Sequence, residues 1–187
     1  MYIRTARTAD AARLLEIYAY YVEHTAITFE YDVPSVDEFR ERIRHTLEKY
    51  PYIVCVEDGK ITGYAYAGPF KARAAYAWCV ETSIYVSKDA RGRGIGSALL
   101  NELEGILKRQ NILNVNACIT VPRRGEDEYL TNASERFHER KGYTKVGTFH
   151  DCGYKFGRWY NMIWMEKMIG EHGSVVPAVI PFPDLAV

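Results

Sequence analysis

The sequence predicts a single α/β domain, and three observations support this fold class. Strand-like and helix-like segments alternate along most of the chain, as they do when helices cover a sheet. A glycine-rich loop at 91–97 joins one strand-like segment directly to an amphipathic helical segment. The chain of 187 residues is long enough to bury a sizeable core and short enough to form one domain.

The first half of the chain predicts two helices and three strands. Thr8 and Asp10 are expected to cap the first helix, and Pro34-Ser35 is expected to start the second. Asp58-Gly59 is typical of a two-residue hairpin turn between strands. The expected elements are a strand at 2–4, a helix through 14–22, an aromatic loop at 25–33, a helix through 39–47, and strands at 52–57 and 61–66.

The second half predicts one strand before the glycine-rich loop and three after it. Gly68-Pro69 is expected to interrupt the strand pattern. The expected elements are a strand at 80–86, a helix from the loop to about residue 108, a strand at 114–120, a short helix near 132–140, and strands at 145–152 and 159–168.

The last residues differ in character from the rest of the chain. From Gly170 the sequence is apolar and rich in proline, which disfavours a helix or a central strand. We expect a domain at 1–169 and an extended tail at 170–187 that lies on the domain or on a partner subunit. The alternative is a disordered end.

Composition narrows the functional classes. Lysine plus arginine and aspartate plus glutamate number 24 each, so we expect no binding to nucleic acid or to a membrane surface. No signal peptide or membrane-spanning run is recognisable, which favours a cytoplasmic protein. The four cysteines and the histidines lack metal-ligand spacing, so no metal site is expected. Cys55 and Cys118 lie in apolar strand-like runs and are expected to be buried.

The most informative segment is the loop Arg91-Gly92-Arg93-Gly94-Ile95-Gly96-Ser97. Because it lies between a strand and a helix start, its N–H groups are expected to form a nest for anionic oxygen. A dinucleotide site would need a third glycine where Ser97 or Leu99 stands, and the P-loop triplet Gly-Lys-Ser/Thr is absent. A different phosphate-bearing cofactor is therefore expected. The alternative is a surface turn whose glycines only permit positive φ angles.

Arg91, Gly94 and Gly96 form an Arg-x-x-Gly-x-Gly pattern that resembles the acetyl-CoA loop of the GNAT N-acetyltransferase superfamily. The segments 68–86 and 155–160 are similar to the phosphinothricin and methionine sulfone (sulfoximine) acetyltransferase branch. The resemblance implies an α/β (α+β) GNAT fold, with a mixed sheet of about six to seven strands and about four helices. It also implies acetyl-CoA as co-substrate, a small amino-acid-like amine as acceptor, and a homodimer.

The resemblance also implies how the cofactor is held. The pantetheine arm pairs with the strand before the loop, and the pyrophosphate lies on the loop amides, where Arg91 and Arg93 add positive charge. A backbone N–H of the 84–86 strand would stabilise the oxyanion of the tetrahedral intermediate. The implied cofactor-binding residues are Ile84, Tyr85, Val86, Arg91, Gly92, Arg93, Gly94, Ile95, Gly96, Ser97 and Asn132.

Glu81 is the candidate general base. An acceptor amine must lose a proton before its lone pair attacks the thioester, and a nearby carboxylate can take that proton. Glu81 opens the strand that leads into the loop, and the matching glutamate has this role in similar enzymes. The alternative is a strand-end carboxylate that faces water. We expect none of the four cysteines to act as a nucleophile activated by a histidine, so direct attack in a ternary complex is expected.

His138 and Asn132 each have two interpretations. His138 replaces a tyrosine that protonates the leaving thiolate in many GNAT enzymes, and histidine is able to do the same near neutral pH. It can equally be a half-buried helix residue with a backbone partner. Asn132 matches a CoA contact of the family, but it also begins a sequence that resembles a capping box.

The acceptor site rests on the resemblance to the branch. The implied substrate-binding residues are Lys71, Arg73, Thr82 and Ser83. Lys71 with Arg73 would pair with the acceptor carboxylate, and the alternative is an ordinary basic loop. Phe29 is expected to wall the substrate pocket from the aromatic loop. Tyr31 is expected to wall the same pocket. The loop at 120–131 is longer than the branch predicts, which leaves the substrate open. The alternative functions are acetylation of a peptide or protein N-terminus and a noncatalytic acyl-CoA-binding module.

Overall fold

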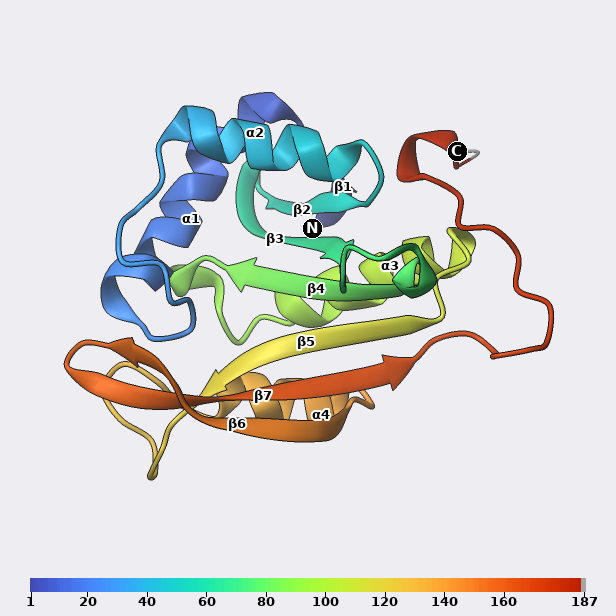
Figure 1. Ribbon diagram of the computed structural model, residues 1–187. Helices are drawn as coiled ribbons and strands as arrows, with labels where there is room; N and C mark the ends of the chain where they lie inside the picture. The colour runs from blue at the N-terminus through green and yellow to red at the C-terminus, as the bar shows by residue number, and fades with distance from the viewer. Residues whose placement is uncertain (186–187) are drawn as a thin grey trace.

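The structure, a computed structural model, describes residues 1–185 and confirms the predicted fold class (Figure 1). One seven-stranded sheet has the strand order β1-β2-β3-β4-β5-β7-β6. β4 and β5 are parallel, whereas every other neighbouring pair is antiparallel. The strands are β1 (Tyr2–Thr5), β2 (Tyr52–Glu57), β3 (Lys60–Pro69), β4 (Cys79–Val86), β5 (Asn114–Val121), β6 (Thr144–Lys155) and β7 (Arg158–Met168).

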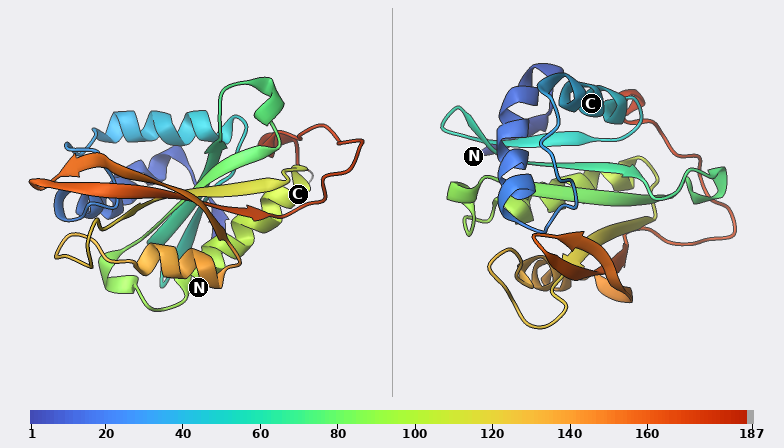
Figure 2. Two further views of the ribbon diagram at one scale, coloured as in Figure 1. Left: turned by 60° about the horizontal axis from the view of Figure 1, so that its bottom comes forward. Right: turned by 60° about the vertical axis from the view of Figure 1, so that its left-hand side comes forward.

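Four α-helices cover the two faces of the sheet. α1 and α2 lie on one face, and α3 and α4 lie on the other (Figure 2). None of the helices within residues 1–185 is both long and apolar enough to cross a membrane. The helices are α1 (Ala11–His24), α2 (Val36–Leu47), α3 (Ile95–Arg109) and α4 (Ala133–Arg140), with short 3-10 turns at Thr8–Asp10, Ala74–Tyr76, Lys88–Ala90 and Phe182–Asp184.

Two of the predicted local signals are confirmed. Asp58 and Gly59 have φ angles of 48° and 76°, which is the left-handed backbone that a two-residue turn between β2 and β3 requires. The hydroxyl of Ser35 accepts the Glu38 N–H at 3.1 Å and caps α2.

The expectation that Gly68-Pro69 interrupts the strand pattern was wrong. β3 continues through both residues, which pair with Glu81 and Val80 of β4. Proline is tolerated there because it is the last residue of the strand, where a missing N–H costs little pairing. The extension matters for the site, because it fixes the start of β4 against β3.

The expected cap of α1 was also wrong. The Asp10 side chain makes no cap bond to α1. Its carboxylate instead accepts the Arg7 N–H at 2.7 Å and pairs with the Arg4 guanidinium at 2.8 Å. The Asp10 carboxylate is thus directed toward Arg4 of β1 and not toward the amides of α1. Thr8–Asp10 forms a separate 3-10 turn before the helix.

The sheet is divided between β4 and β5. The two strands pair only at their beginnings, over Cys79–Glu81 and Asn114–Asn116. Beyond this point β4 stays paired with β3 as far as Val86, and β5 stays paired with β7 as far as Val121. The strands therefore diverge, as Figure 1 shows, and the edge of β4 that faces β5 is left without a strand partner.

The described part of the C-terminal tail lies extended against the end of the sheet and of α3. Gln110, which is 0% exposed, donates from Nε2 to the carbonyls of Lys49 at 2.9 Å and Ile180 at 2.8 Å. The Ile180 N–H returns a bond to the Gln110 carbonyl at 3.0 Å. Trp78 also donates from its indole nitrogen to the Pro177 carbonyl at 2.7 Å.

Replacing Gln110 is expected to destabilise the fold without affecting the site. In Gln110→Leu the Ile180 carbonyl loses the Nε2 donor and the Lys49 carbonyl keeps only the Phe182 N–H, which costs about 0.5–1.5 kcal/mol of the free energy of unfolding. Urea unfolding followed by circular dichroism measures this loss. An unfolding midpoint equal to that of the wild type would contradict the role of this contact.

Candidate active site

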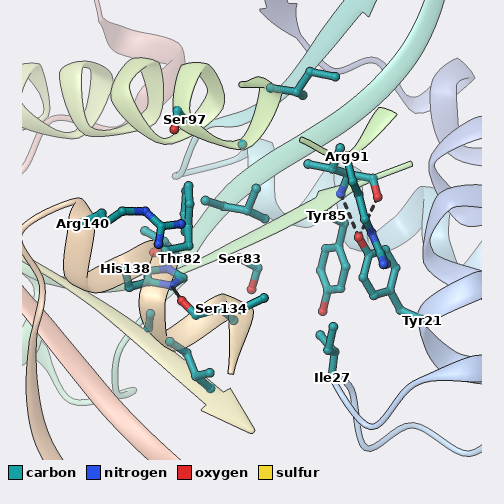
Figure 3. Close-up of a pocket in the computed structure, with 18 of the residues that line it drawn as sticks. Tyr21, Ile27, Thr82, Ser83, Tyr85, Arg91, Ser97, Ser134, His138 and Arg140 are labelled. Atoms are coloured by element: carbon teal, nitrogen blue, oxygen red, sulfur yellow. Dashed lines mark hydrogen bonds between the residues drawn. The ribbon is translucent and has the colours of Figure 1, made fainter. Parts of the chain in front are cut away.

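The divergence of β4 and β5 opens a cavity of about 440 Å³ beside the glycine-rich turn (Figure 3). Its walls come from β4, β5, α4, and the glycine-rich turn with the first residues of α3. α1 and the loop that follows it complete the lining. The lining residues are Tyr21, Ile27, Thr82–Val86, Ala90–Gly92, Gly94–Ser97, Ala117–Ile119, Ala133, Ser134, Phe137, His138 and Arg140.

The free edge of β4 turns backbone groups toward this cavity. The Ser87 N–H points to β3, where it bonds the Thr62 carbonyl at 2.8 Å. Val86 points the other way, and the Tyr21 hydroxyl donates to its carbonyl at 2.6 Å and accepts from its N–H at 3.2 Å (Figure 3). Because backbone direction alternates along a strand, the N–H and carbonyl of Ile84 also face away from β3, toward the cavity.

The glycine-rich turn lies at the end of this free edge. Gly92 and Gly94 have φ angles of 77° and 82°, so glycine is the residue type that forms this turn without strain. α3 begins at Ile95, so the unpaired amides and the positive end of its dipole face the cavity. Arg91 packs on the Tyr21 ring at 5.0 Å and lines the cavity. This end of the cavity therefore favours an anionic group.

Glu81 lies at the point where β4 and β5 separate, opposite Asn116. Its carboxyl is half-buried. Burial raises the pKa of the Glu81 carboxyl above its usual value, and the positive charge of Lys71 lowers it in part. Burial therefore leaves Glu81 with a carboxylate of increased basicity. Glu81 is not itself among the residues that line the cavity, but it directly precedes Thr82, which is.

His138 is buried in the wall opposite β4. Its Nδ1 is 2.8 Å from the Ser134 carbonyl, which only accepts, so Nδ1 carries a proton and the neutral ring leaves Nε2 as an acceptor. Burial lowers the pKa of His138 below its usual value. The ring thus has the backbone partner that one interpretation anticipates, and it also lines the cavity as the other requires.

One interpretation requires Asn132 to line the cavity, but it is not among the lining residues. The other requires a helix cap, but the Asn132 side chain makes no cap bond to α4. The loop at 120–131 contacts the start of α4 instead, because Glu126 Oε1 accepts the N–H of Asn132 itself at 3.1 Å. Arg93 is likewise directed elsewhere and pairs with Glu57 at 3.2 Å.

The predicted acceptor residues are brought together only in part. Thr82 and Ser83 line the cavity. Lys71 lies over the Phe70 and Trp164 rings, at 4.7 and 5.3 Å, on the side of Glu81. Arg73 lies outside the cavity, in a separate hollow near the end of α2.

The aromatic loop contributes differently from what the sequence predicts. Phe29 is absent from the lining residues and packs against Gly153, where a Cβ atom would overlap its ring. The Tyr31 hydroxyl bonds the Tyr154 carbonyl. Ile27, which the sequence did not single out, reaches the cavity instead (Figure 3).

Cys55 is buried as predicted, but the expectation for Cys118 was wrong. Cys118 is exposed at the cavity, because β5 has no strand partner there on its β4 side. Desolvation by its neighbours, with a contribution from the charge of Glu81, raises the pKa of the Cys118 thiol to about 12. A protonated thiol is a poor nucleophile. Within residues 1–185 no three His, Cys, Asp or Glu side chains are grouped to hold a metal ion.

Several lining residues had no signal in the sequence pattern. Tyr21 belongs to α1, and its position on the face toward β4 follows from helix packing. Ser134 and Arg140 come from α4, one at each end of that short helix. The helical period identifies which residues face the sheet, but it does not identify which of them reach the cavity between β4 and β5.

The divided mixed sheet, with a glycine-rich turn at the end of its free strand edge, has the architecture of a GNAT acetyltransferase. The chain belongs to the acetyltransferase (GNAT) domain family, which matches residues 3–164.

Individual relatives agree with this family. The chain is 35% identical to a phosphinothricin N-acetyltransferase of Streptomyces viridochromogenes, over 88% of this chain and 86% of that protein. It is 32% identical to an L-methionine sulfoximine/L-methionine sulfone acetyltransferase of Salmonella typhimurium, over 93% and 98%. A phosphinothricin acetyltransferase from Sinorhizobium meliloti, crystallised with AcCoA, superposes with a TM-score of 0.86 at 34% identity, over 98% and 96%.

Proposed function

We propose that the protein transfers the acetyl group of acetyl-CoA to the primary amine of a small amino-acid-like substrate of the phosphinothricin, methionine sulfone or methionine sulfoximine type. The observation that carries this proposal is the free edge of β4, which leads from Glu81 to the amides of the glycine-rich turn. The relatives named for these acceptors, and the solved relative with AcCoA, support the same chemistry.

The proposed donor fits the groups that the cavity offers. An extended amide-containing arm would find the N–H and carbonyl of Ile84 on the free edge of β4. A pyrophosphate would lie at the start of α3, where Gly94 and Gly96 leave room and the amides point outward. Arg91 and Arg140 on the cavity wall would add charge to the same region.

The proposed reaction needs one base and one oxyanion donor. Glu81 accepts the proton of the acceptor ammonium, directly or through water, and the freed nitrogen forms a bond to the thioester carbon. The Ile84 N–H stabilises the oxyanion of the tetrahedral intermediate. The oxyanion then re-forms the carbonyl as the C–S bond breaks, the sulfur leaves with the electron pair as CoA thiolate, and the nitrogen releases its second proton to water. The protonated thiol of Cys118 supports direct transfer without an acetylated cysteine.

We assign His138 the return of a proton to the leaving thiolate. Its place on the cavity wall supports this role. Only the imidazolium form donates, and its population falls as pH rises through a pKa below the usual 6.5.

His138→Phe is therefore expected to lower kcat most at low pH. The ratio of wild-type to variant kcat should decline toward one as pH rises, and protonation of Glu81 cancels from this ratio. Steady-state kinetics across pH 5 to 9 checks the prediction. A ratio that does not change with pH would rule out the acid role.

The acceptor side supports a small substrate. Thr82 and Ser83 lie beside Glu81, and the charge of Lys71 on the same side would attract a carboxylate. We further propose that the protein works as a homodimer. Val146 and Phe149 on the edge strand β6 are 60% and 55% exposed, which supports a covered face in solution. The molar mass in solution checks this part of the proposal.

The function is tested by measuring CoA release with a panel of acceptors. Phosphinothricin, methionine sulfone and methionine sulfoximine are compared with short peptides that have a free N-terminus. Release with the amino acids alone is the expected result. Release with peptides alone would favour N-terminal acetylation. Tight acetyl-CoA binding without release from any acceptor would favour a noncatalytic module.

A further inference from the structure

The tip of the β6–β7 hairpin takes no part in the proposed chemistry, although its sequence 155–160 marks the branch. Phe156 and Gly157 have φ angles of 51° and 73° and form a tight turn. Side chains on either side of this turn reach two different loops, 25–31 and 126–130.

Lys155 is the most buried charged residue of this tip, with 3% exposure. Its Nζ donates to the carbonyls of Val22 at 2.7 Å, Thr25 at 3.0 Å and Thr28 at 2.9 Å. Burial lowers the pKa of Lys155 below its usual value. These three carbonyls use all three N–H donors of the ammonium group, so one side chain fixes the backbone at three points.

Two of these carbonyls lie on either side of Ile27. The backbone at Thr25 and at Thr28 is thereby held, and Ile27 between them is presented to the cavity (Figure 3). Lys155 does not line the cavity itself. Its effect on the cavity must therefore pass through this loop.

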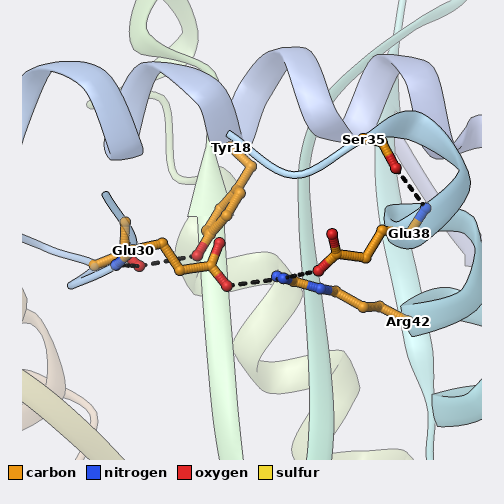
Figure 4. A network of polar contacts seen from close by, with 6 residues as sticks. Tyr18, Glu30, Ser35, Glu38 and Arg42 are labelled. Carbon is orange, nitrogen blue, oxygen red and sulfur yellow. Dashed lines mark hydrogen bonds and ion pairs between the residues drawn. The ribbon is translucent and has the colours of Figure 1, made fainter. Parts of the chain in front are cut away.

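The same loop has further anchors on both sides. Tyr31 bonds the carbonyl of Tyr154, next to Lys155. On the other side Glu30 pairs with Arg42 of α2 at 2.8 Å, and the Tyr18 hydroxyl lies 2.8 Å from Thr28 Oγ1 (Figure 4). So many contacts on one short segment indicate that its conformation is specified rather than free.

On the β7 side of the hairpin tip, side chains contact the loop at 120–131. Arg158 pairs with Glu128 at 2.6 Å and with Asp127 at 3.4 Å, and the Tyr160 hydroxyl donates to Asp127 at 3.2 Å. The Phe156 ring stacks on Tyr129 at 4.2 Å. The two loops also meet each other, because the Ala26 N–H bonds the Tyr129 carbonyl at 3.1 Å.

We propose that Lys155 is a positioning residue for the acceptor. It holds the backbone on both sides of Ile27, which lines the cavity together with Ser83 and Tyr85, and these two residues share one face of β4 with Glu81. This inference rests on the proposed function. Lys155 touches neither acceptor nor donor. Its loss should therefore change the Michaelis constant for the acceptor and spare the donor end of the cavity, which is formed by β4 and the glycine-rich turn.

The test compares Lys155→Met with two other variants. Tyr31→Phe removes a weaker anchor of the same loop from an exposed residue, and Gln110→Leu removes a buried polar group far from the cavity. Acceptor KM and kcat are measured with excess acetyl-CoA, and acetyl-CoA Kd is measured by calorimetry. We expect Lys155→Met to lower kcat/KM for the acceptor about tenfold to a hundredfold. Tyr31→Phe should lower it about two- to fivefold.

Acetyl-CoA Kd should stay within about twofold in all three variants, and acceptor KM should be unchanged in Gln110→Leu. A folded Lys155→Met protein with wild-type acceptor KM, or with equal losses toward acceptor and donor, would overturn the inference. Should that variant not fold, Tyr31→Phe decides by the same criterion. A wild-type protein that releases no CoA with any acceptor would instead overturn the proposed function, and this inference with it.

Discussion

Glu81→Gln is expected to lower kcat by roughly a hundredfold to ten-thousandfold, the range typical of a lost general base. The amide has nearly the same shape as the carboxylate but cannot take the proton of the acceptor ammonium. Acetyl-CoA binding should be retained, because the groups assigned to the donor lie on β4 beyond Glu81 and on the glycine-rich turn. Calorimetry of donor binding and steady-state kinetics measure the two effects separately.

The direction of the Glu81 pKa shift predicts how Glu81→Gln affects the stability of the fold. Its folded-state pKa is raised, so folding opposes ionisation and the charged carboxylate adds no stability at neutral pH. Gln is therefore not expected to lower the unfolding midpoint. The pH dependence also follows: wild-type kcat rises with pH through a pKa above the usual carboxyl value, and this rise disappears in Glu81→Gln. Undiminished turnover in the variant would exclude Glu81 as the base.

Gly96→Val is expected to weaken acetyl-CoA binding by about tenfold or more. A Cβ atom at Gly96 would lie 3.7 Å from the Phe137 ring and 3.9 Å from Val86 Cγ2, which is ordinary contact. The free protein therefore accommodates a Cβ atom here, and we expect the two further methyl groups of valine to occupy cavity space needed by the donor. Calorimetry with acetyl-CoA measures the change in Kd.

Substitutions at two other glycines distinguish blocking of the donor site from backbone strain. Gly105→Ala on the same helix meets nothing within 4 Å and should gain about 0.5–1 kcal/mol of stability with unchanged donor Kd. Gly94→Ala should lose stability, because its φ of 82° strains any L side chain. Wild-type donor affinity in Gly96→Val would place the donor elsewhere than in this cavity.

The order of elements was predictable because each depends on local signals. Asp58-Gly59, Ser35 and the apolar periods of the helices act within a few residues, and the structure has them where they were expected. The strand with Glu81 and the glycine-rich turn are likewise adjacent in sequence, so their joint position beside one cavity follows from local order.

The positions of side chains that are set by contacts between distant parts of the chain were not predictable from the sequence. Ile27 rather than Phe29 reaches the cavity, because a lysine more than a hundred residues later fixes the loop backbone. Arg93 resembles Arg91 in sequence, but Glu57 of β2 pairs with it away from the cavity. No spacing rule gives such partners, since they are set by how the strands and loops pack.

The most direct test of the account is the product formed from acetyl-CoA and methionine sulfone. Mass spectrometry of the wild-type reaction is expected to show one acetyl group on the amine of the acceptor, with one CoA released per product. The Glu81→Gln protein should bind acetyl-CoA and form almost none. Acetyl-CoA that binds to the wild-type protein but yields no acetylated amine from any acceptor of the panel would contradict the account.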